Sequence, residues 1–158
     1  MPQLVKGGKY VFGWTSVKDD ISLRIPDEAF EEYDFTNCEY FILISGSLAS
    51  GGFSLCDKRS IVKSKIGKRV IASVGYMEES DSFTTGILEI IYSGERWLSW
   101  TKRKGENSIC LSKELIGILG LSVGSKLLVA RGSGLGPAFI SKGPIFNEAK
   151  KHGDLLEY

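Results

Sequence analysis

One stretch of ten residues carries a complete local folding pattern: Ile21-Ser22-Leu23-Arg24-Ile25-Pro26-Asp27-Glu28-Ala29-Phe30. Its first half alternates apolar and polar residues, as a strand with one buried face does. Pro26 then ends the strand and fits the first turn of a helix. Asp27 and Glu28 follow, where the positive end of a helix dipole favours negative charge. The stretch therefore predicts a strand that passes directly into a short helix.

The flanking sequence extends this pattern on both sides. An aromatic-rich strand is predicted before a polar turn at residues 18–20, and an apolar strand is predicted after the helix. A glycine-rich turn then leads into a last strand around Phe53 and Leu55. The order is strand, strand, short helix, strand, strand, with the first strand predicted at residues 10–15 and the third at residues 40–45.

The same order recurs when the chain is shifted by 86 residues, which places residues 8–67 on residues 94–153 without a gap. The alignment has 11 identities in 60 positions, against about 3 or 4 expected from composition, which favours an internal duplication. The identical positions of the first copy are Gly8, Trp14, Thr15, Lys18, Ser22, Glu28, Gly46, Ser47, Phe53, Lys65 and Gly67. The second copy's elements are predicted at residues 96–101, 108–111, 113–119, 126–131 and 138–141.

The 158 residues are therefore expected to be mainly β with short helices, in two β-β-α-β-β units. Unit one spans residues 1–67, a β-rich connector spans 68–93, and unit two spans 94–158. The equivalent Trp14 and Trp100 are expected to pack in the core, and Trp97 and Tyr10 to lie on the exposed strand face. Asp34 aligns with Gly120, at a helix end that often takes a left-handed residue.

These units resemble the AbrB/MazE/SpoVT swapped-hairpin family, through residues 21–44 in unit one and residues 109–129 in unit two. Unit two keeps the family's Leu-Gly-Leu-x-x-Gly run at residues 119–124, whereas Ser112 replaces the proline before the helix. Two units in one chain are similar to the tandem arrangement of MraZ, although neither helix carries its Asp-x-x-x-Arg signature. The resemblance implies an intramolecular pseudo-dimer barrel, either monomeric or homo-oligomeric, and a DNA-binding transcriptional regulator.

The net charge of +1 conceals a segregation of charge along the chain. Residues 1–57 hold 4 basic and 9 acidic side chains, whereas residues 58–69 hold 6 basic and no acidic ones. Residues 102–131 hold 6 basic and 2 acidic side chains. One hypothesis is a single basic face that contacts the DNA backbone. Its predicted residues are Lys58, Arg59, Lys63, Lys65, Lys68, Arg69, Lys102, Arg103, Lys104 and Arg24.

Other interpretations remain open. The basic side chains can instead pair with the acidic first unit, which leaves a non-catalytic protein-interaction module for a basic partner. A third interpretation assigns a small ligand or anion to the Gly-Ser loops, with Arg131, Gly132 and Ser133 as the better candidate, although hairpin turns also explain such loops.

Little in the sequence predicts an enzyme. The single histidine, His152, lies in a polar segment, and Cys38, Cys56 and Cys110 form no C-x-x-C pair. No acid and base are paired with supporting groups, so no catalytic residue, metal or cofactor is predicted. The absence of a signal-peptide pattern and of a run of about 20 apolar residues favours a cytoplasmic protein that does not enter the membrane.

Overall fold

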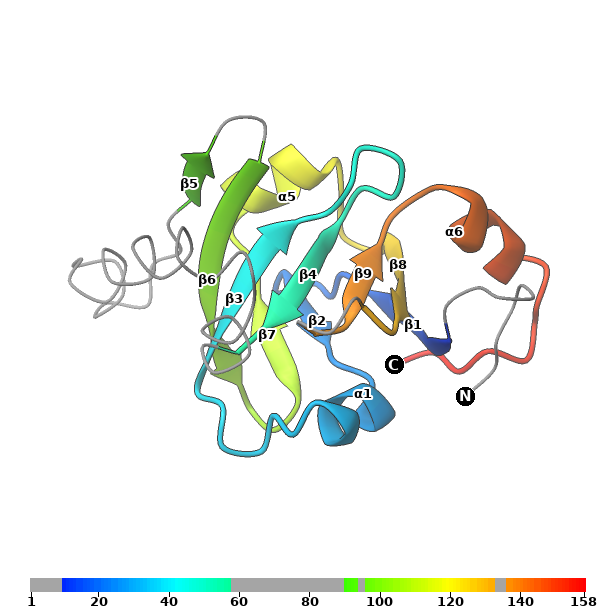
Figure 1. Ribbon diagram of the computed structural model, residues 1–158, viewed down its shortest axis with the longest axis horizontal. Coiled ribbons are helices and arrows are strands. Elements are labelled where there is room, and N and C mark those ends of the chain that lie inside the picture. The colour runs from blue at the N-terminus through cyan, green and yellow to red at the C-terminus, as the bar shows by residue number, and fades with distance from the viewer. Residues whose placement is uncertain (1–9, 58–89, 94–95, 133–135) are drawn as a thin grey trace.

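The computed structural model describes residues 10–57, 90–93, 96–132 and 136–158 (Figure 1). The described residues are mainly β, with three short helices. The elements are β1 (Val11–Ser16), β2 (Ser22–Arg24), α1 (Asp27–Glu32), β3 (Tyr40–Ser45), β4 (Phe53–Cys56), β5 (Ile90–Ser93), β6 (Arg96–Lys104), β7 (Ser108–Cys110), α5 (Lys113–Leu119), β8 (Lys126–Ala130), β9 (Ala138–Ile140) and α6 (Pro144–Ala149). These bounds confirm the predicted order of elements in both halves, whereas residues 68–89 of the predicted β-rich connector lie outside the described residues.

The strands form one antiparallel sheet that curls into a nearly closed barrel of eight strands (Figure 1). Their order is β1-β8-β9-β4-β3-β6-β7-β2, and β5 pairs with β6 beside this path. At the remaining opening, the main-chain N–H of Lys18 donates to the carbonyl oxygen of Ser22 (3.0 Å) in the turn between β1 and β2. Because two-strand hairpins from the two halves alternate around the barrel, neither half closes the barrel on its own.

The pairing register follows the 86-residue shift. Trp14 of β1 lies opposite Leu128 of β8, and the equivalent Trp100 of β6 lies opposite Ile42 of β3. The shift of 86 positions relates Trp14 to Trp100 and Ile42 to Leu128, so the two pairs are equivalent. Strand register is strongly specified where a face is buried, because a slip of one residue would move every side chain to the other face. The duplication in sequence is therefore repeated in the hydrogen-bonded ladders.

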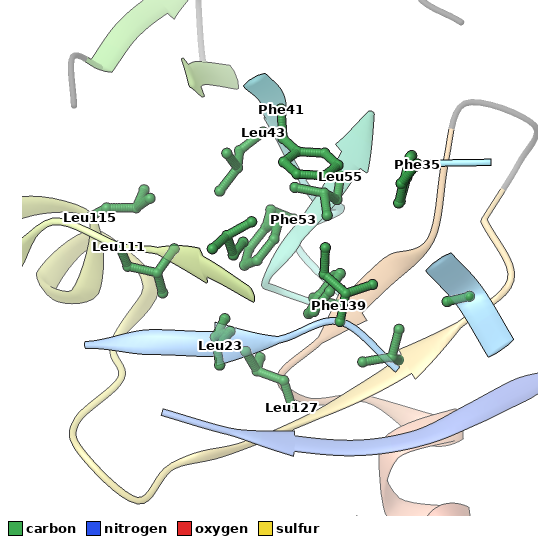
Figure 2. Packing of buried hydrophobic residues seen from close by; sticks show 14 of the residues in the cluster. Leu23, Phe35, Phe41, Leu43, Phe53, Leu55, Leu111, Leu115, Leu127 and Phe139 are labelled. Carbon is green, nitrogen blue, oxygen red and sulfur yellow. The ribbon is translucent and has the colours of Figure 1, made fainter. Parts of the chain in front are cut away.

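Two ladders join equivalent residues directly to one another. Leu23 of β2 lies opposite Ile109 of β7, and Phe53 of β4 lies opposite Phe139 of β9. The rings of this phenylalanine pair stack with centroids 4.8 Å apart and planes 11° apart. Figure 2 shows Leu23, Phe53 and Phe139 within the hydrophobic core, to which both halves contribute residues. The matched Phe in the sequence repeat is thus explained by a core contact between the two copies.

The helices end as the repeat predicts. Asp34, after α1, has φ 52°, and the equivalent Gly120, after α5, has φ 67°. A left-handed residue at this position turns the chain away from the helix. Ser112, which replaces the proline of unit one, accepts a hydrogen bond from the main-chain N–H of Leu115 (3.0 Å) and caps α5.

One aromatic prediction is wrong. Trp97 was expected on the exposed strand face, but its side chain is only 8% exposed, whereas Tyr10 is 38% exposed as expected. Trp97 belongs to the core cluster together with Leu115 of α5, and its main-chain N–H donates to the Ser45 hydroxyl (3.1 Å). Consecutive residues of β6 are buried, because both faces of this strand are covered. Such a strand lacks the alternation of buried and exposed side chains on which the prediction depended. Trp14 and Trp100 are buried as predicted.

Candidate functional site

Four of the ten predicted DNA-contacting residues lie in the described part of the chain. Arg24 is on β2, and Lys102, Arg103 and Lys104 end β6. The other six, at residues 58–69, lie outside the described residues. All four described side chains contact acidic or carbonyl groups of the first half.

Lys104 forms an ion pair with Asp20, in the turn between β1 and β2. The same carboxylate accepts hydrogen bonds from the hydroxyl (2.6 Å) and the main-chain N–H (3.2 Å) of Ser22. Hydrogen bonding to Lys104 and Ser22 lowers the pKa of Asp20 to about 2, and the same contact raises the pKa of Lys104. Both groups are charged at neutral pH, and their charges face each other across the two halves.

Lys102 and Arg103 hold the segment that follows α1. The Lys102 ammonium lies 3.7 Å from the Glu39 carboxylate. The Arg103 guanidinium donates to the carbonyl oxygens of Phe35 (3.2 Å) and Thr36 (3.0 Å). Carbonyls just beyond a helix end need donors, and a guanidinium with five N–H groups supplies two here. Arg103 therefore has a structural partner in the first half.

Arg24 contacts the start of α1. Its guanidinium lies 3.1 Å from the Asp27 carboxylate, which also accepts from the Asn107 side chain (3.0 Å). Asn107 belongs to the turn between β6 and β7, and its carbonyl oxygen accepts from the main-chain N–H of Ile25 (2.7 Å). This turn of the second half is thus fastened to the first half by both side-chain and main-chain bonds.

The described residues as a whole hold 12 Lys/Arg and 14 Asp/Glu side chains, a net charge of −2 with histidine neutral. The basic end of the β6–β7 hairpin lies against acidic groups of the first half, so the two charge excesses compensate each other locally. Polyanion binding needs an excess of basic charge facing outward. Within the described residues, each of the three basic side chains of this hairpin has a partner in the first half.

The predicted anion site at the second Gly-Ser loop is occupied by a carboxylate of the chain itself. Arg131 binds Glu32 of α1 with two hydrogen bonds, one of them 3.1 Å from Nε to Oε2. The main-chain N–H of Gly132 donates to the Tyr33 hydroxyl (3.2 Å), and the Arg131 guanidinium lies 5.0 Å above the Tyr10 ring. Ser133 lies outside the described residues. These contacts join the loop to the end of α1.

The equivalent corner of the first half has different chemistry. The 86-residue shift places Ser45 at the position of Arg131, Ile118 at that of Glu32, and Leu119 at that of Tyr33. No such ion pair is available to these side chains, and a cavity of about 240 Å³ lies between the loop and α5. It is lined by Ser45, Gly46, Ser47, Leu48, Gly51, Gly52, Trp97, Ile118, Leu119, Ser141 and Lys142.

A further contact site, missed by sequence reasoning, lies on the outer edge of β1. The main-chain N–H of Trp14 donates to the Leu156 carbonyl (2.8 Å), and the N–H of Tyr158 donates to the Trp14 carbonyl (2.8 Å). Lys18 Nζ donates to the main-chain oxygen of Tyr158 (2.9 Å), and Lys126 pairs with Glu157. The segment has no apolar alternation that would have predicted a strand.

The described residues contain no group of three His, Cys, Asp or Glu side chains arranged to hold a metal ion. Cys56 is buried, and its burial together with the neighbouring Asp57 raises the pKa of the thiol to about 12, which keeps it protonated. His152 lies 3.5 Å from Glu148 on α6. None of the helices in the described ranges has the length and apolar composition needed to cross a bilayer.

Comparison of the chain with protein-family models, with curated proteins and with solved structures finds no match. Two features of the described residues are candidate sites: the basic side chains that fasten the two halves together, and the outer edge of β1, which residues 153–158 cover.

Proposed function

We propose that this chain is a non-catalytic protein-interaction module, built as an intramolecular pseudo-dimer of swapped-hairpin units like those of the AbrB/MazE/SpoVT family. The observation that carries the proposal is the pairing of Lys102, Arg103 and Lys104 with groups of the first half. Side chains engaged in this way hold the barrel together. The pseudo-dimer is supported by the ladders that join equivalent residues, such as Phe53 with Phe139.

The surface offered to a partner is acidic. Helix α1 and the turn after it expose Glu28, Glu31 and Asp34. Exposed carboxylates grouped on one short element attract a positively charged surface and increase the rate of its encounter. A basic protein is therefore the partner that this module fits.

The first test separates a structural role of the hairpin lysines from a DNA-contacting role. The variants Lys102→Gln and Lys104→Gln are compared with the native chain in thermal unfolding and in gel-shift titrations with duplex DNA at low salt. The proposal expects a lower melting temperature and unchanged duplex binding. Weaker duplex binding at an unchanged melting temperature would overturn it.

The second test addresses the acidic surface, with a lysine-rich peptide as the probe. Glu28→Gln combined with Glu31→Gln is expected to weaken binding of the peptide, increasingly so at low salt, where charges are less screened. Glu114→Gln is the matched control, because Glu114 is the exposed equivalent of Glu28 in the second half. Equal losses in the variant and the control would contradict an assignment to α1.

DNA binding remains a second candidate because residues 58–69 hold six basic and no acidic side chains. This proposal expects a gel shift that weakens steeply with salt. The triple variant Lys63→Gln, Lys65→Gln, Lys68→Gln is expected to lower the slope of log K against log salt by about 2.7, if each lysine neutralises one phosphate. No shift with any duplex at low salt would rule this candidate out.

A further inference from the structure

The outer edges of β1 and β6 are covered in different ways. The two strands are equivalent under the 86-residue shift, and each pairs with a strand of the other half on its inner edge. On its outer edge β6 pairs with β5 over four residues, from Ile90↔Ser99 to Ser93↔Arg96. On the outer edge of β1, the described part of the chain contributes the bridge between Trp14 and Glu157. The segment on the outer edge of β1 therefore pairs over fewer residues than β5 does on β6.

The edge segment, residues 153–158, is weakly embedded. Gly153, Asp154 and Glu157 are exposed, and the Leu156 side chain is 65% exposed. A cavity of about 270 Å³ is lined by residues of this segment together with Trp14 of β1 and Phe146 of α6. Segments with few buried contacts and exposed hydrogen bonds are the ones that open at low free-energy cost. The bonds from Lys18 and Lys126 to the edge segment are exposed, and Leu155 packs, partly buried, against the apolar cluster around Trp14.

The contacts that hold the edge segment define a recognition pattern. Lys126 takes an acidic side chain at the position of Glu157. Arg24 lies 5.8 Å from the centre of the Tyr158 ring, and Lys18 binds the main-chain oxygen of the same residue. Together these contacts select an acidic residue followed by an aromatic one.

Gly13 completes the site from the side of β1. A Cβ built on it would lie 2.5 Å from the Leu156 carbonyl oxygen, and its φ of 141° is rare for other residues. Any side chain there would push an incoming main chain away. The absence of a side chain at this position therefore lets an extended segment approach the edge closely.

We propose that the outer edge of β1 is an acceptor site for an extended segment of another protein, one that presents an acidic residue followed by an aromatic residue. The edge segment of this chain occupies the site until such a partner displaces it. Strand addition of this kind takes its affinity from main-chain hydrogen bonds and its specificity from side-chain contacts. This proposal does not depend on the acidic surface of α1, and a different experiment tests it.

The test uses a fluorescent peptide with the sequence of residues 152–158, followed by anisotropy. It is titrated with the native chain and with the release variant, which combines Glu157→Gln and Tyr158→Pro in the chain of residues 1–158. The variant loses the attraction to Lys126 and the N–H that donates to Trp14, so its edge is more often free. Apparent affinity scales with the fraction of competent molecules, and we expect the variant to bind at least about tenfold more tightly. Equal binding by both chains, or binding by neither, would overturn the proposal.

Charge reversal identifies the site of binding. In the release variant, Lys126→Glu is expected to weaken binding of the native peptide and to restore binding of a peptide that carries Glu157→Lys. Glu148→Gln on α6 is the control and is expected to leave binding unchanged, because Glu148 contacts His152 and Lys151 rather than β1. Equal effects of Lys126→Glu on both peptides would contradict a site at this edge.

A second copy of the chain is the competing occupant. If the native chain forms a concentration-dependent dimer that Gly13→Ala disrupts, the edge belongs to the segment of a second copy, and the proposal of a different partner fails. A native chain that shows the same mass at all concentrations, together with tighter peptide binding by the release variant, supports it. Thermal unfolding of the Gly13→Ala chain confirms that the barrel is intact in this comparison.

Discussion

Two equivalent threonines differ in how their buried hydroxyls are satisfied. The Thr101 hydroxyl donates to the carbonyl oxygen of Cys110 (2.7 Å), whereas the Thr15 hydroxyl has no partner among the described residues. Both side chains are buried. A buried polar group without a partner costs folding free energy, because the water that it loses is not replaced. The duplication therefore supplies an internal comparison of the same residue in two states.

Replacing each threonine with valine, which has nearly the same shape, is expected to have opposite effects. Thr15→Val removes an unpaired hydroxyl and is expected to raise the free energy of unfolding by about 1 kcal/mol, whereas Thr101→Val is expected to lower it by a similar amount. Urea titrations of both variants measure the difference. Losses of the same size in both would mean that the Thr15 hydroxyl is satisfied in solution.

The Asp20 carboxyl predicts an acid-sensitive contribution to stability. Its pKa is lowered from the ordinary value of 3.8 to about 2, chiefly by hydrogen bonding to Lys104. A lowered folded-state pKa stabilises the protein above the unfolded value, and this contribution is lost as the pH falls through the folded value. Asp20→Asn is therefore expected to reduce the fall in melting temperature between pH 4 and 2. Asp154→Asn, at an exposed carboxyl, is the control, and a similar change in both would refute the assignment to Asp20.

At the level of elements, the contact between Arg131 and Glu32 fastens the second Gly-Ser loop to α1. Both side chains are partly exposed, so the coupling between them is expected to be small and to weaken further at high salt. A double-mutant cycle with Arg131→Ala and Glu32→Ala, measured by urea unfolding at low and high salt, tests this expectation. A coupling of zero at low salt would show that the loop is positioned without the ion pair.

The elements themselves were largely predictable from the sequence. The helix predicted at residues 113–119 and the strand predicted at residues 40–45 have the bounds that the structure gives α5 and β3. Periodicity and turn residues act locally, and the second copy of the repeat corroborated the first. Elements with a clear hydrophobic periodicity and a capping residue could thus be predicted without knowledge of the fold.

The candidate sites were predicted less well because they depend on partners distant in sequence. Lys104 contacts Asp20 across 84 positions, and Lys18 contacts Tyr158 across 140. The charge of residues 102–104 was visible in the sequence, but the barrel register decides which carboxylates face it. The edge segment carries no strand pattern, because one bridge to β1 requires no alternation. Such contacts follow from tertiary structure alone.

For the whole molecule, the alternation of strands implies that neither half has a complete set of partners. β1 pairs with β8, β3 with β6, β2 with β7, and β4 with β9, and each of these pairs joins the first half to the second. Cutting the chain between β5 and β6 would leave unpaired edges and an uncovered core in each piece. If the halves form a pseudo-dimer, however, a second copy of one half can supply equivalent strands.

Expressed alone, residues 94–158 are therefore expected to form a homodimer in which Ile109 and Phe139 each meet their own counterpart in the second copy. Co-expressed with residues 1–93, the same piece is expected to form a one-to-one complex instead, because the native pairs Leu23↔Ile109 and Phe53↔Phe139 are then restored. Sedimentation equilibrium distinguishes the two assemblies by mass, and near-ultraviolet circular dichroism compares the complex with the intact chain. A folded monomer of either piece would refute the pseudo-dimer, since a half that is stable alone needs no strands from the other.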